Sequence, residues 1–122
     1  MVVGISAAID FHEAYDVEPV LQEVFANREA ARQQTATLHL HPLNWPLSMR
    51  IVCDPADPLW LDGCERLASK LYSSSIPHEY DFTTTTGGDR AAYDRMQLKN
   101  AIEFVVQRLP EAARQLEIVT GL

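Results

Sequence analysis

The stretch that decides the fold runs from Met49 to Asp57 and reads MRIVCDPAD. Its first five residues form a short, mostly apolar run, which predicts a buried strand, and its last four form an acidic turn with a proline. A second such unit follows: residues 78–83 predict a strand that opens through a threonine tract into Gly87-Gly88-Asp89. Each predicted strand therefore delivers a carboxylate just beyond its carboxyl end.

The segments before this stretch also alternate between strand and helix patterns. The apolar run at residues 2–9 is too short for a stable helix and predicts another buried strand. Helical patterns cover residues 18–25 and 28–38, with Asn27 as a cap between them. His41 to Pro46 forms a linker, because its two prolines forbid a continuous helix.

Two later segments carry apolar residues at helical spacing. One helix follows the acidic turn, ends near Pro77, and has an apolar face of Leu61, Cys64, Leu67, Ala68 and Leu71. The other is the last helix, interrupted by Pro110, with a stripe of Leu98, Ala101, Ile102, Val105, Val106 and Leu109. Strands joined by such long crossovers pair in parallel, through right-handed connections. The sequence predicts an α/β fold: a small three-layer sandwich with a short, mainly parallel three-stranded sheet and flanking helices.

Length and composition limit the possible classes of protein. The chain has 122 residues, enough for one hydrophobic core, so residues 1–122 are expected to form a single domain. A net charge of −7 disfavours nucleic acid and anionic membranes as partners. No run approaches the roughly 18 apolar residues of a membrane span, and the apolar start lacks the basic leader of a signal peptide. Two cysteines make no disulfide framework, which predicts a cytoplasmic protein.

Candidate site residues gather where the predicted strands end. In open parallel sheets, function concentrates at the carboxyl ends of the strands, where Asp54, Asp57 and residues 87–89 lie. His78 begins its strand at the opposite end and is a poor candidate for a base. Trp60 either lines a substrate cleft or packs over the sheet. Gly87 and Gly88 could bind an anion through their amides, although Asp89 disfavours this electrostatically.

These residues resemble the C-terminal part of an α/β-hydrolase of the esterase type, similar to the esterase D and S-formylglutathione hydrolase-like esterases. The resemblance implies that Asp57 holds the position of the triad acid. It also implies that the Gly-Gly corner precedes the histidine position, which here is Asp89. Residues 3–10 resemble the strand that comes after the nucleophile segment. The chain would thus correspond to the back half of that family's domain.

The departures from the family decide the chemistry. A catalytic triad needs a serine, a histidine that accepts its proton and an acid that orients the histidine. The carboxylate of Asp89 is too weak a base to replace an imidazole. Residues 4–8, GISAA, approximate the G-x-S-x-G elbow, which makes Ser6 a candidate nucleophile. The preceding strand is very short for an elbow, and a buried strand serine is the favoured interpretation of Ser6.

Metal and thiol chemistry find little support in the sequence. His39 and His41 alternate as metal pairs do, but no third ligand is evident, so a solvent-facing pair is favoured. Cys64 lies on an apolar stripe, which favours a core residue over a reactive thiol. We therefore predict no metal site and no cofactor.

Two functional hypotheses and one prediction about assembly remain. The chain is either a truncated or degenerate hydrolase half without activity, or a hydrolase subunit whose partner chain supplies the serine and a base. In both, residues 2–8 form a strand without a neighbour on one side. An exposed strand edge is a template for pairing, which predicts a homo-oligomer, most simply a dimer.

Overall fold

The computed structural model describes residues 1–41 and 43–121 and contains a parallel sheet of three strands. The strands are β1 (Val2–Ile5), β2 (Met49–Val52) and β3 (Glu79–Asp81), in the order β1-β2-β3. Gly4 is in register with Ile51, which in turn is in register with Tyr80. The predicted small α/β fold with a parallel sheet and flanking helices is confirmed.

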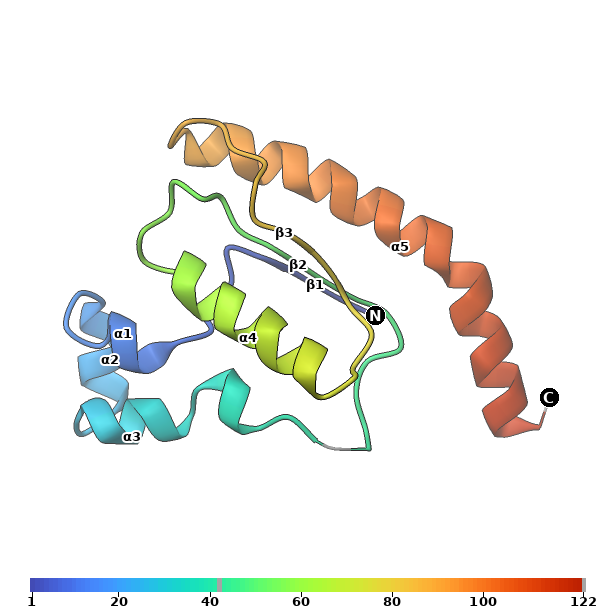
Figure 1. Ribbon diagram of the computed structural model, residues 1–122, viewed down its shortest axis with the longest axis horizontal. Helices are drawn as coiled ribbons and strands as arrows, with labels where there is room; N and C mark the ends of the chain where they lie inside the picture. The colour runs from blue at the N-terminus through green and yellow to red at the C-terminus, as the bar shows by residue number, and fades with distance from the viewer. Residues whose placement is uncertain (42, 122) are drawn as a thin grey trace.

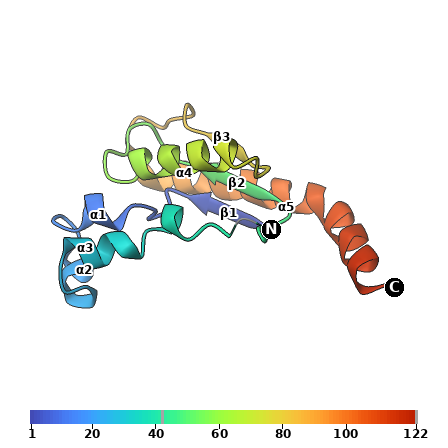
Figure 2. The same ribbon diagram turned by 60° about the horizontal axis from the view of Figure 1, so that its bottom comes forward.

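The sheet is the middle of three layers (Figures 1 and 2). Helix α4 (Leu61–Ser73) covers one face and α5 (Arg90–Thr120) covers the other. The apolar face predicted for α4 is confirmed, because Cys64, Leu67, Ala68 and Leu71 are buried and Leu61 packs beside them. Cys64, Leu67 and Leu71 form the main core with Ile51 and Cys53 of the central strand segment.

Helix α5 packs on a different face from the one predicted. The buried side chains are Tyr93, Gln97, Ala101 and Phe104. Most of the predicted stripe is exposed: Leu98, Ile102, Val106 and Leu109 each keep at least half of their surface in solvent. The prediction was wrong because two sets of residues have helical spacing, and the set with the large rings fits the sheet.

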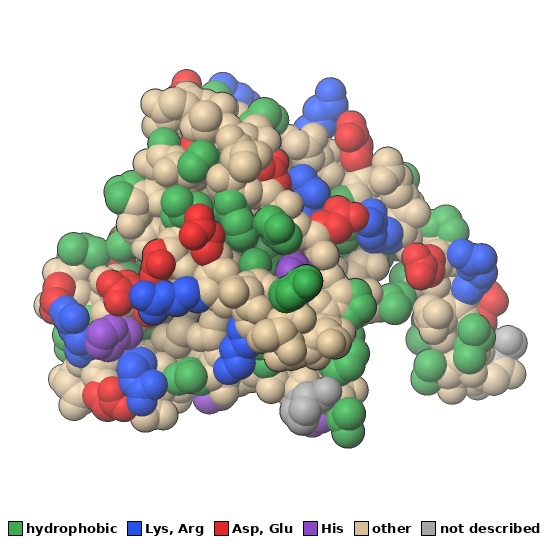
Figure 3. Space-filling model, in the orientation of Figure 1, with side chains coloured by type: hydrophobic (Ala, Val, Ile, Leu, Met, Phe, Trp, Pro, Cys, Tyr) green, Lys and Arg blue, Asp and Glu red, His purple; other side chains and the backbone are tan. Residues whose placement is uncertain are grey.

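The end of α5 projects beyond the sheet. Pro110 lies inside this helix, which continues to Thr120 and changes direction in its last third (Figure 1). The predicted interruption is therefore a bend, as expected where proline removes one helical hydrogen bond. Hydrophobic side chains stand among charged ones on this projecting part (Figure 3).

The segment between β1 and β2 forms a small satellite of short helices. These are α1 (Phe11–Ala14), α2 (Pro19–Val24), α3 (Arg28–Gln33) and the 3-10 turn η1 (Ala36–Leu38). They lie beside α4, away from the faces of the sheet (Figure 1). Asn27 caps α3 as predicted, its side chain accepting a hydrogen bond from the Ala30 N–H (2.8 Å).

Several boundaries differ from the sequence prediction. Strand β3 covers Glu79–Asp81 instead of residues 78–83. The first strand ends at Ile5 instead of residue 9, because the backbone turns at Ser6. The chain then enters α1, which was not predicted and which Asp10 caps through the Glu13 N–H (3.0 Å). The predicted helix over residues 28–38 divides into α3 and η1. The predicted linker includes residue 42, which lies outside the described residues.

No described helix is long and apolar enough to cross a membrane.

Candidate functional site

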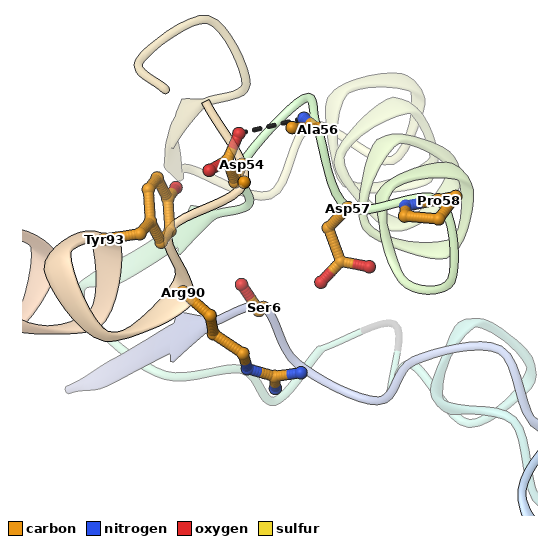
Figure 4. Close-up of a pocket in the computed structure, with 8 residues that line it drawn as sticks. Ser6, Asp54, Ala56, Asp57, Pro58, Arg90 and Tyr93 are labelled. Atoms are coloured by element: carbon orange, nitrogen blue, oxygen red, sulfur yellow. Dashed lines mark hydrogen bonds between the residues drawn. The ribbon is translucent and has the colours of Figure 1, made fainter. Parts of the chain in front are cut away.

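A cavity of about 200 Å³ opens at the carboxyl ends of the three strands (Figure 4). The loop after β2 contributes Asp54, Asp57 and their neighbours, and the turn after β1 contributes Ser6. The start of α5 closes the third side. The complete lining is Ser6, Asp54, Ala56, Asp57, Pro58, Gly88, Arg90 and Tyr93. The cavity therefore lies at the carboxyl ends of the parallel strands, where the sequence predicted the site.

Asp54 is a structural carboxylate that ties the β2 loop to the threonine tract. It is buried and accepts hydrogen bonds from the Ala56 N–H (2.8 Å) and the Thr85 hydroxyl (2.6 Å), with a longer one from the Thr86 N–H (3.5 Å). The Thr85 hydroxyl is the main reason that the pKa of Asp54 lies below its usual value. Asp54 is ionised and fully engaged, so its role is to fix the cavity wall.

Asp57 presents its carboxylate to the cavity. Its Oδ1 accepts hydrogen bonds from the N–H groups of Leu59 (3.0 Å) and Trp60 (3.2 Å), which holds the loop at the start of α4. The side chain points toward the space above Ser6 (Figure 4). Among the described contacts, Oδ2 has no hydrogen-bond partner within the chain. One oxygen of Asp57 is thus positioned and the other is available to a ligand.

Ser6 is not the buried strand serine that the sequence favoured. It is half-buried, follows the last residue of β1, and has a φ of 47°. A left-handed backbone costs a residue other than glycine about 1 kcal/mol or more. The Ser6 N–H donates to the carbonyl of Val52 (2.9 Å), which continues the β1–β2 ladder and holds the turn. The hydroxyl therefore lies at the cavity (Figure 4).

Asp89 serves as the N-cap of α5. Its carboxylate accepts a hydrogen bond from the Ala92 N–H (3.1 Å), and it does not line the cavity. The two preceding glycines have φ values of 68° and 94°, a backbone conformation that favours glycine. Gly88 borders the cavity, whereas Gly87 does not. The Gly-Gly corner thus serves the entry into α5, and the carboxylate after it is engaged as the helix cap.

Trp60 does not line the cavity. It is 8% exposed and packs in the main core, which settles its two proposed roles in favour of packing. Sequence reasoning missed Arg90, which projects from the first turn of α5 at the cavity (Figure 4). It also assigned no role to Tyr93, whose pKa is raised by burial and by nearby carboxylates, first of all Asp81. The position of Arg90 at the cavity could not be derived without the α5 backbone.

No imidazole borders the cavity, although all four histidines lie within the described residues. His78 lies at the amino end of the sheet, where its ring nitrogen is 2.9 Å from the carbonyl oxygen of Ile76. His39 and His41 lie in the exposed chain before β2. The described residues contain no cluster of three His, Cys, Asp or Glu side chains that could hold a metal ion. Cys64 is a core residue, as predicted.

The cavity thus combines a hydroxyl, two carboxylates and a guanidinium. A serine hydroxyl near neutral pH needs a neighbouring base before it can attack an acyl carbon. The carboxylates are the only candidate bases in the lining, and they are weak. Comparisons of the chain with protein families, curated proteins and solved structures find no significant match.

Proposed function

We propose that this chain is a degenerate half of an esterase-like α/β-hydrolase that has no catalytic activity on its own. The proposal is supported by the order of its parts: a parallel strand, an acidic loop, helix α4, a further strand, a Gly-Gly corner and a long last helix. The observation that carries it is the position of Asp89. The residue at the place of the expected histidine caps a helix and leaves the cavity without an imidazole.

The chemistry of the cavity explains why activity is not expected. Ser6 has the turn-like backbone of a nucleophile, but the imidazole that would take its proton is missing. Loss of one member of a triad costs about four powers of ten in rate. An ionised carboxylate beside the serine would further oppose the oxyanion that forms during acyl transfer. The cavity is therefore better suited to holding a polar or cationic group than to cleaving an ester.

The alternative is that the chain is one subunit of a serine hydrolase. The free Oδ2 of Asp57 favours it, because this atom could accept a hydrogen bond from an imidazole that another chain brings in. In that complex Asp57 would orient the incoming histidine. The buried free thiols of Cys53 and Cys64 fit a reducing cytoplasm, which we propose as the compartment for either function.

The test is turnover of p-nitrophenyl acetate and S-formylglutathione by the purified chain, with the Ser6→Ala variant as the matched control. The proposal predicts equal background rates for both proteins. Turnover in the wild type that disappears with Ser6→Ala would overturn it. To test the alternative, the chain is mixed with a polypeptide that carries a G-x-S-x-G elbow and is encoded beside it. Activity that depends on Asp57, and is lost with Asp57→Asn, would establish the two-chain enzyme.

A further inference from the structure

Strand β1 has one unpaired edge. Among the described residues it pairs only with β2. On that side, the Val2 N–H donates to the carbonyl of Ser48 and the Ser6 N–H donates to the carbonyl of Val52 (both 2.9 Å). Backbone groups of successive strand residues point to opposite sides. Val3 and Ile5 therefore direct their N–H and C=O groups to the open edge. Such groups are a template for pairing with another strand.

An apolar surface lies on the same side of the molecule. We call it the α5 stripe, and it consists of Leu98, Ile102, Val105 and Leu109. Val105 is half-buried, and the other three expose 56%, 57% and 50% of their surface.

The position of the polar flank of α5 shows on which side of the helix the α5 stripe lies. That flank is polar and lies over β2 and β3, where Asn100, Glu103 and Gln107 border a cavity with Arg50 and Glu79. Helical geometry places the α5 stripe on the other flank, toward β1. The apolar stripe and the open strand edge thus adjoin each other.

We propose that the β1 edge and the α5 stripe together form a dimer interface with a second copy of this chain. A two-fold axis perpendicular to the sheet, beside β1, pairs the two β1 strands antiparallel into one six-stranded sheet. The same axis leaves both α5 helices on one face and brings their β1-side flanks together. Two features that are unsatisfied in the single chain are therefore satisfied by one operation, as an isologous interface requires.

The unpaired groups fix the register of this pairing. Val3 and Ile5 carry the outward groups, so Val3 must lie opposite Ile5 of the second copy and Ile5 opposite Val3. The axis then passes beside Gly4, so that Gly4 of one chain lies opposite Gly4 of the other. In a pair of this kind without direct hydrogen bonds, Cα atoms approach to about 4.5 Å, which a residue without a side chain accommodates well. Self-complementarity is the reason for choosing a second copy over an unrelated partner.

The inference does not rest on the proposed function. A catalytically active chain could dimerise in this way, and an inactive one could remain monomeric. The dimerisation test therefore measures mass and amide exchange, and no outcome of it depends on hydrolysis.

Three variants test the interface by sedimentation velocity and light scattering at micromolar concentration. Ile102→Lys places a charge in the α5 stripe. Ile118→Lys is the matched control, since it makes the same change at a side chain that is 75% exposed on the projecting end of α5. Val3→Pro removes an N–H group that points to the open edge and donates no hydrogen bond within the sheet, so the fold of the chain is retained.

The wild type is expected at twice the 13.7 kDa of the single chain. Ile102→Lys and Val3→Pro should weaken association by about 100-fold or more, as charged or unpaired groups do at the centre of an interface. Ile118→Lys should remain dimeric. A monomeric wild type, a dimer that survives both variants, or an assembly that grows without closing would each overturn the proposal.

Amide exchange of the wild type keeps the test decisive if a variant does not fold. On dilution below the dissociation constant, the Val3 and Ile5 amides should lose protection, while the Val2 and Ser6 amides, which donate to β2, should keep it. Protection of Val3 and Ile5 that is independent of concentration would show that the edge is covered within one chain, and would overturn the proposal as well.

Discussion

The carboxylate of Asp81 is expected to stabilise the threonine tract, which binds Asp54 in the cavity wall through Thr85. Its oxygens accept hydrogen bonds from the Thr83 N–H (3.0 Å), the Thr84 N–H (3.1 Å) and the Thr84 hydroxyl (2.6 Å). Burial is the largest single influence and raises the pKa of Asp81. The hydrogen bonds together outweigh it and lower the pKa from 3.8 to about 2. The Asp81→Asn variant keeps the shape of the side chain and removes its charge.

The size of the effect follows from these two pKa values. A carboxyl with a pKa of 3.8 when unfolded and about 2 when folded corresponds to about 2.5 kcal/mol, which solvent screening of this partly exposed group reduces to about 2 kcal/mol at neutral pH. Because the folded pKa is the lower one, this stabilisation is complete well above pH 3.8. It is lost as the pH falls toward the folded value. The free-energy difference between wild type and Asp81→Asn should be about 2 kcal/mol at pH 7 and about 1 kcal/mol at pH 3.

Urea denaturation followed by far-UV circular dichroism measures both differences. Asp94→Asn is the matched control. That carboxylate is 51% exposed and makes a long ion pair, 4.0 Å, with the Arg90 guanidinium. It should change the free energy of unfolding by less than about 0.5 kcal/mol at either pH. If Asp81→Asn behaved like Asp94→Asn, or if its effect were equal at pH 7 and pH 3, the hydrogen-bonded carboxylate would not be the source of the stability.

Three further variants or reagents test other parts of the account. Asp89→His should restore no turnover of p-nitrophenyl acetate, since residue 89 does not line the cavity. It should cost about 1 kcal/mol in urea because the helix cap is lost; clear turnover would contradict this. Leu71→Ala should lower the free energy of unfolding by about 3 kcal/mol. Leu43→Ala changes a side chain that is 85% exposed and should leave the free energy of unfolding nearly unchanged. Similar losses for the two variants would argue against the described core. Cys53 and Cys64 should react with a thiol reagent only after unfolding, because both side chains are fully buried and their thiols donate to the carbonyl groups of Asp54 and Ala7. Rapid labelling of the native chain would count against a closed core.

Strands β1 and β2 were predictable because each is a short apolar run followed by a turn signal. Strand β3, in which Glu79 and Asp81 flank Tyr80, is not an apolar run. The face of α5 was not predictable, because hydropathy alone favours Leu98 and Ile102 over Tyr93 and Gln97. The buried set is chosen by shape and by polar satisfaction. The Gln97 amide reaches the Tyr93 hydroxyl at 3.4 Å, so both polar groups have a partner inside the fold.

The location of the site could be predicted from the sequence, but the arrangement of its side chains could not. The rule that function gathers at the carboxyl ends of parallel strands brought Asp54 and Asp57 to one edge correctly. Their different roles depend on which amides and hydroxyls surround each carboxylate. Asp57 binds amides two and three positions away, whereas Asp54 also binds Thr85 and Thr86, about thirty positions away. The strained turn at Ser6 likewise depends on its bond to Val52 across the sheet, which no local pattern reveals.

The reactivity of Ser6 is the most direct test of the central claim that this cavity is not a catalytic site. The measurement is the intact mass of the native chain after incubation with a fluorophosphonate, with Ser6→Ala treated in parallel. Without an imidazole in the cavity, the account predicts that both proteins keep their original mass. Stoichiometric addition to the wild type that is absent from Ser6→Ala would show an activated nucleophile and contradict the account.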